Sequence, residues 1–133
     1  MNNKQNLYFA LGQVAYAIAA ADGSIQKAEK EKLHHILTEG VKGHEMDFDY
    51  SEIIFTLMNK DHIDVKTAYD WGLSQFKLNS QYFSEKMKKD FVAVLEKVAA
   101  AFPPTTADEK NWIDTFKKDI SKIKGDPVFT GEN

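Results

Sequence analysis

Apolar residues recur at helical spacing along most of the chain. The longest pattern predicts a helix that Pro103-Pro104 would end, and its face consists of Phe83, Met87, Phe91, Val94, Leu95, Val98 and Phe102. Shorter patterns predict helices over residues 7–21, 25–40, 53–58, 64–76 and 106–123. No stretch shows the alternation that a half-buried strand requires. The sequence therefore predicts a compact all-α fold of about six helices.

Local signals support several of these helix boundaries. Asp64 is a suitable N-cap for the helix that follows it. Thr106 and Glu109 have the spacing of a capping box. Gly125-Asp126-Pro127 is predicted to begin a flexible tail over residues 125–133, so a single helical domain is expected over 1–124.

The two ends of this domain resemble each other. When the sequence is shifted by 80 positions, Ala19-Ala20-Ala21 falls on Ala99-Ala100-Ala101, and Glu29-Lys30 falls on Glu109-Lys110. The same shift places Leu11, Val14, Ala15 and Ile18 on Phe91, Val94, Leu95 and Val98. The shared pattern indicates an old duplication of a helix-turn-helix unit, with halves at about 7–40 and 83–124. Small alanine side chains would let the two copies approach closely.

The first predicted helix allows a second interpretation. Residues 7–21 are mostly small and apolar and follow Lys4, as in a secretory signal peptide. Gln13 interrupts the apolar run, however, and the matching segment at 91–101 lies deep within the chain. A core helix is therefore the favoured interpretation.

Composition narrows the functional classes. The chain has 133 residues, and its 17 basic and 20 acidic residues give a net charge of −3. This balance argues against a nucleic-acid partner, because such proteins usually carry a strongly basic face. The chain contains no cysteine, which excludes disulfides, thiolate metal sites and a thiol nucleophile. The absence of cysteine also fits the expected cytoplasmic location. No apolar stretch is long enough to cross a bilayer, so no direct membrane insertion is expected.

The stretch AAADGSIQKAE, residues 19–29, resembles the second half of a calcium-binding EF-hand loop. Loop positions 5, 6, 8 and 12 are occupied by Asp22, Gly23, Ile25 and Glu29. Positions 1 and 3 are Ile18 and Ala20, and neither side chain can bind a cation. Two carboxylates and a carbonyl leave calcium with too few oxygen ligands, so a standard EF-hand is excluded.

The same residues also suit a purely structural turn. Gly23 could end one helix, and Asp22 could accept backbone hydrogen bonds in an Asx turn. Glu29 would then lie near the N-terminus of the next helix, where a negative charge is favourable. From these residues alone, a ligand site and a helix cap both remain open.

The motif A-A-D-G-x-I-x-x-x-E-x-x-x-L, from Ala20 to Leu33, resembles the signature of the TerB family of tellurite-resistance proteins. It also occurs in TerB-like domains such as the membrane-proximal domain of DjlA co-chaperones, which are all-helical and duplicated. The clear match covers residues 11–37. The resemblance implies that Asp22 and Glu29 belong to an acidic patch that binds a divalent metal ion or a partner. The family usually repeats the D-G pair in its second half, whereas this chain has Phe102-Pro103 there.

Charged and aromatic surface residues offer further candidates. Trp71 and Trp112 lie off the main apolar stripes, so each could anchor a protein partner or simply widen a buried face. The acidic segment at 44–52 is interpreted as a solvated connector, with weak cation binding as the alternative. The lysine-rich segments at 85–90 and 116–124 are predicted to be solvated helix faces, with an acidic partner as the alternative.

No catalytic constellation is present in the sequence, which lacks a G-x-S-x-G elbow and a glycine-rich phosphate loop, so a non-enzymatic function is expected. The leading hypothesis is a TerB-like binding or scaffold module in a stress-response context, which presents Asp22 and Glu29 to a divalent metal ion or a basic partner. The rival hypothesis is a metal-independent helical adaptor that binds through Trp71 or Trp112. A small metal-dependent enzyme at the acidic turn is a third alternative.

Overall fold

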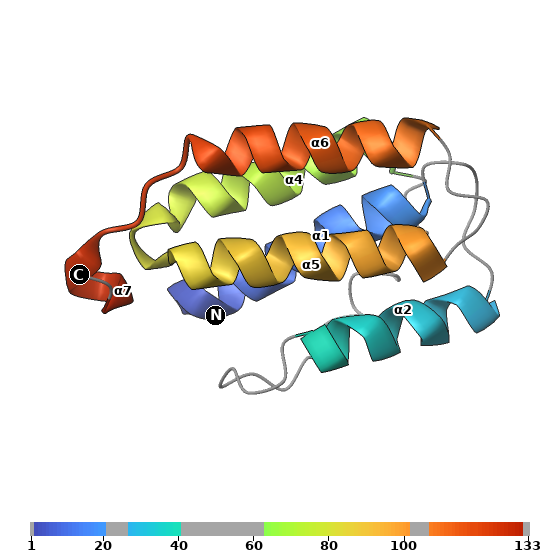
Figure 1. Cartoon of the computed structure of the whole chain (residues 1–133), viewed down its shortest axis with the longest axis horizontal. Coiled ribbons are helices and arrows are strands. Elements are labelled where there is room, and N and C mark those ends of the chain that lie inside the picture. The colour runs from blue at the N-terminus through green and yellow to red at the C-terminus, as the bar shows by residue number, and fades with distance from the viewer. Residues whose placement is uncertain (1, 21–26, 41–62, 102–106, 132–133) are drawn as a thin grey trace.

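The computed structural model describes residues 2–20, 27–40, 63–101 and 107–131, and all regular elements in these ranges are helical (Figure 1). The elements are α1 (Asn3–Ala19), α2 (Lys27–Gly40), α4 (Val65–Leu78), the short 3-10 helix η1 (Ser80–Tyr82), α5 (Glu85–Ala101), α6 (Ala107–Ser121) and α7 (Pro127–Thr130). The predicted all-α fold is confirmed. Within the described ranges, no helix combines the length and apolar character needed to cross a membrane.

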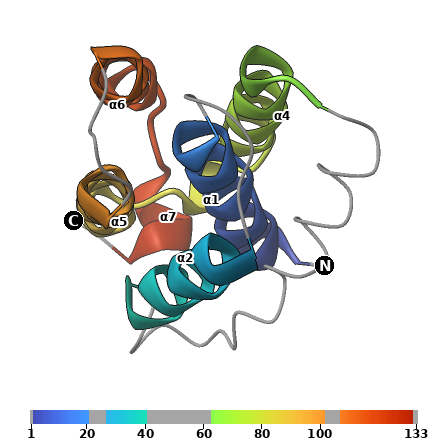
Figure 2. The same cartoon turned by 90° about the vertical axis from the view of Figure 1, so that its right-hand side faces the viewer.

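Helix α1 lies in the middle of the bundle and contacts α2, α4, α5 and α6 (Figure 2). Its N-terminus carries a reciprocal cap: Asn2 Oδ1 accepts from the Gln5 N–H at 2.8 Å, and Gln5 Oε1 accepts from the Asn2 N–H at 2.9 Å. This cap explains why the helix begins before the predicted apolar stripe. From Leu7 to Ala19, every residue except Phe9 is buried. The structure thus places the apolar N-terminal segment in the core, where a helix can be apolar on all sides.

The helices are arranged as two similar pairs. Helices α1 and α5 run in the same direction, whereas α2, α4 and α6 run back (Figure 1). Helices α1 and α5 contact each other, and each also contacts both α2 and α6. The apolar positions that the repeat aligns are buried in both copies, namely Leu11, Val14, Ala15 and Ile18 in α1 and Phe91, Val94, Leu95 and Val98 in α5. This packing is the kind that a duplication would produce, and the duplication itself stays a prediction.

Several helix ends follow the predicted signals. Asp64 caps α4, since its Oδ1 accepts a hydrogen bond from the Thr67 N–H at 2.7 Å. Helix α5 ends at Ala101, just before the two prolines. The predicted helix at 53–58 and the predicted capping box of Thr106 and Glu109 lie outside the described residues and side chains.

Helix α4 approaches α1 closely at Gly72. A Cβ atom at this position would lie 2.7 Å from Cγ2 of Val14 and 3.1 Å from the carbonyl oxygen of Ala10. A larger residue would therefore push the two helices apart. The absence of a side chain at position 72 lets α4 bring its aromatic residues into the core.

Four phenylalanines join α4, α5 and α6. The ring of Phe76, which is fully buried, lies 5.0 Å from that of Phe83, 6.0 Å from that of Phe91 and 5.6 Å from that of Phe116, measured between centroids. Stacked and edge-on contacts at these separations add to the hydrophobic gain from burial. Phe76 is therefore the residue through which α4 is fixed to the C-terminal helix pair.

Within the C-terminal segment at 125–133, for which a flexible tail was predicted, the structure places residues 127–130 in the short helix α7. Asp126 precedes this helix, and its N–H donates to the carbonyl oxygen of Gln81 in η1 at 3.0 Å. The rings of Tyr82 and Phe129 lie 5.0 Å apart. These contacts join α7 to η1. Both helices are too short to show an apolar periodicity, so no sequence pattern predicted them.

We expect Phe76→Ala to lower the free energy of unfolding by about 3–5 kcal/mol, because it removes a fully buried ring and leaves a cavity among three others. Urea unfolding followed by circular dichroism measures this change. Leu78→Ala, on the same helix, is the matched control because Leu78 is 71% exposed. Its effect should stay within about 0.5 kcal/mol. Equal losses in the two variants would contradict the assignment of Phe76 to the core.

Candidate functional site

The predicted acidic turn connects two helices whose ends are defined. Helix α1 ends at Ala19, and the N–H of Ala20 still donates to the carbonyl oxygen of Tyr16 at 2.9 Å. Helix α2 begins at Lys27, so Glu29 belongs to its first turn, as the sequence predicted. Asp22 and the side chain of Glu29 lie outside the described part, as does the acidic segment at 44–52. A metal site at this turn therefore stays a prediction.

The described side chains include no group of three or more His, Cys, Asp or Glu residues suited to hold a metal ion. Glu31 and His35 of α2 line a hollow of about 700 Å³ beside α5, together with Lys97. Lys32 also borders this hollow, and its Nζ donates to the carbonyl oxygen of Ala101 at the end of α5 (2.7 Å). This lysine therefore caps α5 and ties it to α2.

The two candidate tryptophans occupy different environments. Trp71 of α4 is 45% exposed, whereas Trp112 of α6 is half-buried and packs against the core. The ring of Trp112 lies 4.8 Å from that of Tyr69, measured between centroids. Trp112 thus widens a buried face, which is one of the two alternatives that the sequence left open. Of the two indoles, Trp71 presents more surface to solvent.

Tyr69 joins α4 to α6 through a polar contact as well. Its hydroxyl group donates to Oδ2 of Asp119 at 2.7 Å. Burial of the phenol, reinforced by the hydrogen bond and negative charge of Asp119, raises the pKa of Tyr69 well above its ordinary value. Tyr69 is therefore a neutral donor throughout the physiological pH range, and it holds one carboxylate oxygen in place.

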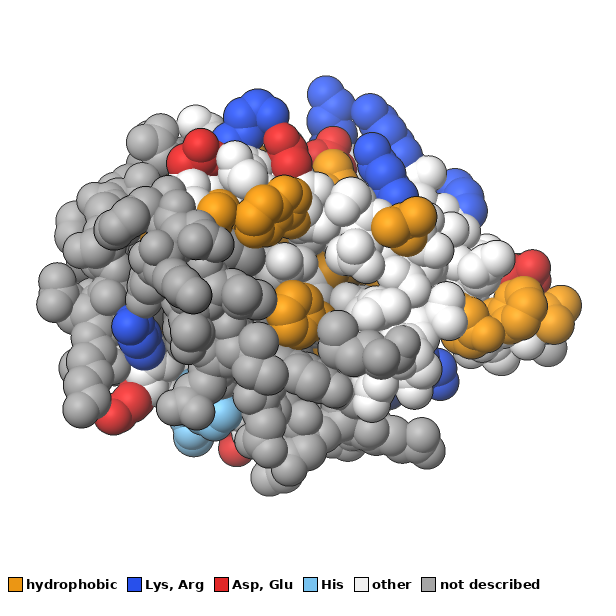
Figure 3. Space-filling model, turned by 180° about the vertical axis from the view of Figure 1, so that it is seen from behind, with side chains coloured by type: hydrophobic (Ala, Val, Ile, Leu, Met, Phe, Trp, Pro, Cys, Tyr) orange, Lys and Arg blue, Asp and Glu red, His pale blue; other side chains and the backbone are white. Residues whose placement is uncertain are grey.

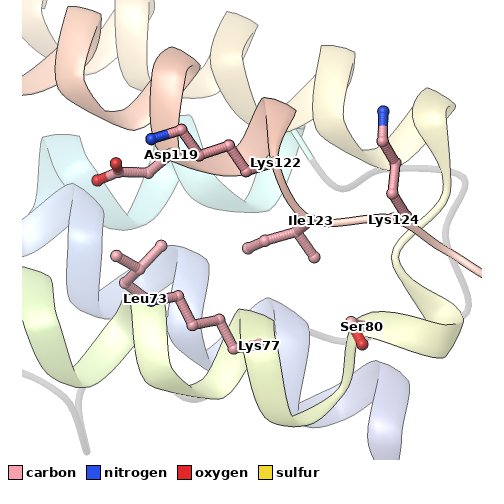
Figure 4. Close-up of a pocket in the computed structure, with 7 residues that line it drawn as sticks. All are labelled: Leu73, Lys77, Ser80, Asp119, Lys122, Ile123 and Lys124. Carbon is pink, nitrogen blue, oxygen red and sulfur yellow. The ribbon is translucent and has the colours of Figure 1, made fainter.

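A groove of about 480 Å³ lies between the C-terminal ends of α4 and α6 (Figure 4). The two helices are bridged here by long side chains, including the Tyr69–Asp119 hydrogen bond and the Phe76–Phe116 contact. The lining residues are Leu73, Lys77, Ser80, Asp119, Lys122, Ile123 and Lys124. Lysine side chains also gather along the edge of the molecule formed by α6 (Figure 3). The sequence indicated the lysines at 116–124, but it could not show that Lys77 lines the same groove as Lys122 and Lys124.

Lys88 departs from the predicted solvated face at 85–90, because it is only 6% exposed. Its Nζ donates to the carbonyl oxygen of Ile123 and to Oε1 of Glu85, the latter at 3.0 Å. The ammonium group also lies 5.7 Å from the centroid of the Phe83 ring. A buried cation at this position satisfies a carbonyl just beyond α6 and so joins α5 to the C-terminal segment. The pattern of neighbouring lysines carries no signal that would single out this one.

Comparison with known proteins identifies no relative: no protein-family model, no curated protein and no solved structure matches the chain. The candidate functions therefore rest on the sequence motif and on the surfaces described above.

We expect Tyr69→Phe to reduce the dependence of stability on alkaline pH. Because the pKa of Tyr69 is raised in the folded state, the unfolded chain loses its phenolic proton first, at a pH of about 10. Above that pH, this group lowers wild-type stability by about 1.4 kcal/mol per pH unit, and the contribution is absent in the variant. Urea unfolding at a series of pH values from neutral upwards measures both slopes. If the free energy of unfolding falls equally steeply with pH in the wild type and in Tyr69→Phe above a pH of about 10, the raised pKa of Tyr69 does not contribute to stability.

Proposed function

We propose that this chain is a non-catalytic, TerB-like helical binding module that engages a protein partner through the outer face of α4. The observation that supports this proposal is the exposure of Trp71, at 45%. Leu78, which is 71% exposed, follows it at i+7 and lies on the same side of the helix. Exposed tryptophans are costly in water and are enriched among the residues that contribute most to protein–protein binding.

The opposite side of α4 gives this surface a rigid base. Gly72 and Phe76 are buried, one against α1 and the other among the phenylalanines. The Lys66–Asp70 ion pair, with Nζ and Oδ2 2.6 Å apart, gives the same helix a charged margin. Apolar side chains at i and i+7 with polar neighbours suit a partner that offers an apolar groove to a helix. A partner of this chemistry would bury the indole and Leu78 together.

Trp71→Ala should abolish most of this binding. Partners captured on the immobilised wild-type chain are identified by mass spectrometry, and direct binding of the purified partner is then measured by calorimetry. Loss of a central indole should raise the dissociation constant about thirtyfold or more, which corresponds to about 2 kcal/mol. Trp112→Phe is the matched control because Trp112 packs against Tyr69. Equal affinities of wild type and Trp71→Ala would refute the proposal.

A second candidate function is divalent-metal or partner binding at the turn between α1 and α2. The spacing of Asp22, Gly23, Ile25 and Glu29 supports it, together with the location of Glu29 in the first turn of α2. The stress-response context and the cytoplasmic location suggested by the sequence belong to the same proposal. In this function, the first half of the duplicated fold would carry the site, because the second half has Phe102-Pro103 in place of the D-G pair.

Thermal unfolding after EDTA treatment, with and without a panel of divalent metal ions, tests the second candidate. A metal that binds only the folded chain should raise its stability by about 2.7 kcal/mol at a hundredfold excess over the dissociation constant. Asp22→Asn and Glu29→Gln should lose this gain. Glu39→Gln, an exposed change on the same α2 helix, should retain it. If no metal stabilises the wild type, or if all variants respond alike, the turn is not a metal site.

A further inference from the structure

The groove between α4 and α6 has a charge opposite to that of the whole chain. The net charge of the protein is −3. The charged residues that line the groove are nevertheless Lys77, Lys122 and Lys124 against the single carboxylate of Asp119. A generally basic composition therefore does not account for this positive surface. The packing of α4 against the end of α6 brings Lys77 into the same groove as Lys122 and Lys124.

Lysines line both walls of the groove, and its floor is apolar. In Figure 4 the side chain of Lys122 extends along α6 past Asp119, and that of Lys124 points away from Leu73 and Lys77. Figure 4 shows Leu73 and Lys77 on the α4 wall and Asp119 and Lys122 on the other, with Ile123 between them. Ile123 is buried, and Leu73 is half-buried. The volume of about 480 Å³ lies within the range of ligand-binding clefts. The groove thus offers both a hydrophobic contact and cationic groups at its rim.

The charges of this groove are only partly neutralised by the protein. Within the described part of the chain, ion pairs join Lys66 to Asp70, Lys88 to Glu85 and Lys117 to Glu96, and none includes Lys77 or Lys122. Asp119 already accepts the hydrogen bond of the Tyr69 hydroxyl group. Both lysines lie at helix C-termini, where their charge also stabilises the helix end. Their ammonium groups still have N–H donors to offer to a ligand.

We propose that this groove binds a short acidic segment of a partner protein. Carboxylates of the segment would pair with Lys77 and Lys122, and an apolar side chain between them would cover Leu73 and Ile123. Leu73 and Lys77 are one helical turn apart, or about 6 Å along α4. An extended peptide covers about the same distance with two residues. A segment of two or three residues can therefore cover the α4 wall of the groove from Leu73 to Lys77.

Other anions fit these observations less well. A phosphate ion would use the lysines but leave the apolar floor of Leu73 and Ile123 uncovered. A nucleic acid would need a longer basic track along several successive phosphates, together with stacking aromatic residues, and neither lines this groove. Residues 73 and 77 also lie on a different side of α4 from Trp71 and Leu78. This site is thus separate from the surface assigned to Trp71, and it stands or falls independently of that assignment.

An amide NMR titration of the full chain with the peptide acetyl-Glu-Leu-Glu-amide tests the proposal. We expect saturable shifts in the amides of residues 73–80 and 119–124, and weaker binding at higher salt. Lys77→Gln/Lys122→Gln should bind this peptide about threefold to tenfold more weakly, the range expected for two solvent-accessible charge pairs. Lys4→Gln/Lys110→Gln removes the same charge from exposed positions elsewhere and should bind like the wild type.

The competing ligands are distinguished in the same titration. If the neutral peptide acetyl-Gln-Leu-Gln-amide binds as tightly as the acidic one, or if the groove variant matches its control, the proposal is wrong. It is also overturned if inorganic phosphate binds as tightly as the peptide at these amides, which would indicate a small-anion site. Tighter binding of a short single-stranded oligonucleotide at these amides would likewise replace the acidic segment by a nucleic acid.

Discussion

Helix α1 is the central constraint on the described part of the fold, because it leaves little surface for solvent and lies against four other helices. Its residues from Leu7 to Ala19 are buried with the exception of Phe9, and α2, α4, α5 and α6 all contact it. Burial of one large aliphatic side chain contributes about 1.5–3 kcal/mol. Helix α1 buries Leu7, Leu11, Val14 and Ile18 along one stripe. The close approach of α4 at Gly72 follows from the same constraint. Displacement of α1 would therefore remove apolar contact from α2, α4, α5 and α6 together.

Around this central helix, α4 and α6 are joined mainly by long side chains. Tyr69 reaches both Trp112 and Asp119, and Phe76 reaches Phe116. These contacts join the two helices, and the groove lies beside them, because Asp119 takes part in the hydrogen bond and also lines the groove. Lys88 joins α5 to the segment that follows α6, since its buried ammonium group donates a hydrogen bond to the carbonyl oxygen of Ile123. The same packing that builds the core therefore also forms the walls of the groove that we propose as a binding site.

Two of the proposed binding surfaces lie on α4 and depend on its fixed position. Trp71 and Leu78 lie on the outer side of α4, and Lys77 borders the groove on another side of the same helix. Both surfaces depend on the burial of Phe76, which fixes α4 in position. The third proposed surface, at Asp22 and Glu29, belongs to the connection between α1 and α2, where the proposed second copy has Phe102-Pro103 in place of Asp22-Gly23. One helix of such a scaffold can therefore carry two separate surfaces.

The local sequence was sufficient to predict most of the helices, because helical periodicity and caps depend on residues only a few positions apart. Asp64 was identified as an N-cap by its own neighbours, and the burial of the stripe from Phe83 to Val98 followed from its spacing. Tertiary structure alone separated residues that look alike in sequence. Lys88 is buried while Lys89 is exposed, and Trp112 packs on Tyr69 while Trp71 faces solvent. The groove and the contact of α7 with η1 also join residues that are distant along the chain. Their environments depend on how helices pack against one another, and no local pattern of apolar and polar residues encodes that.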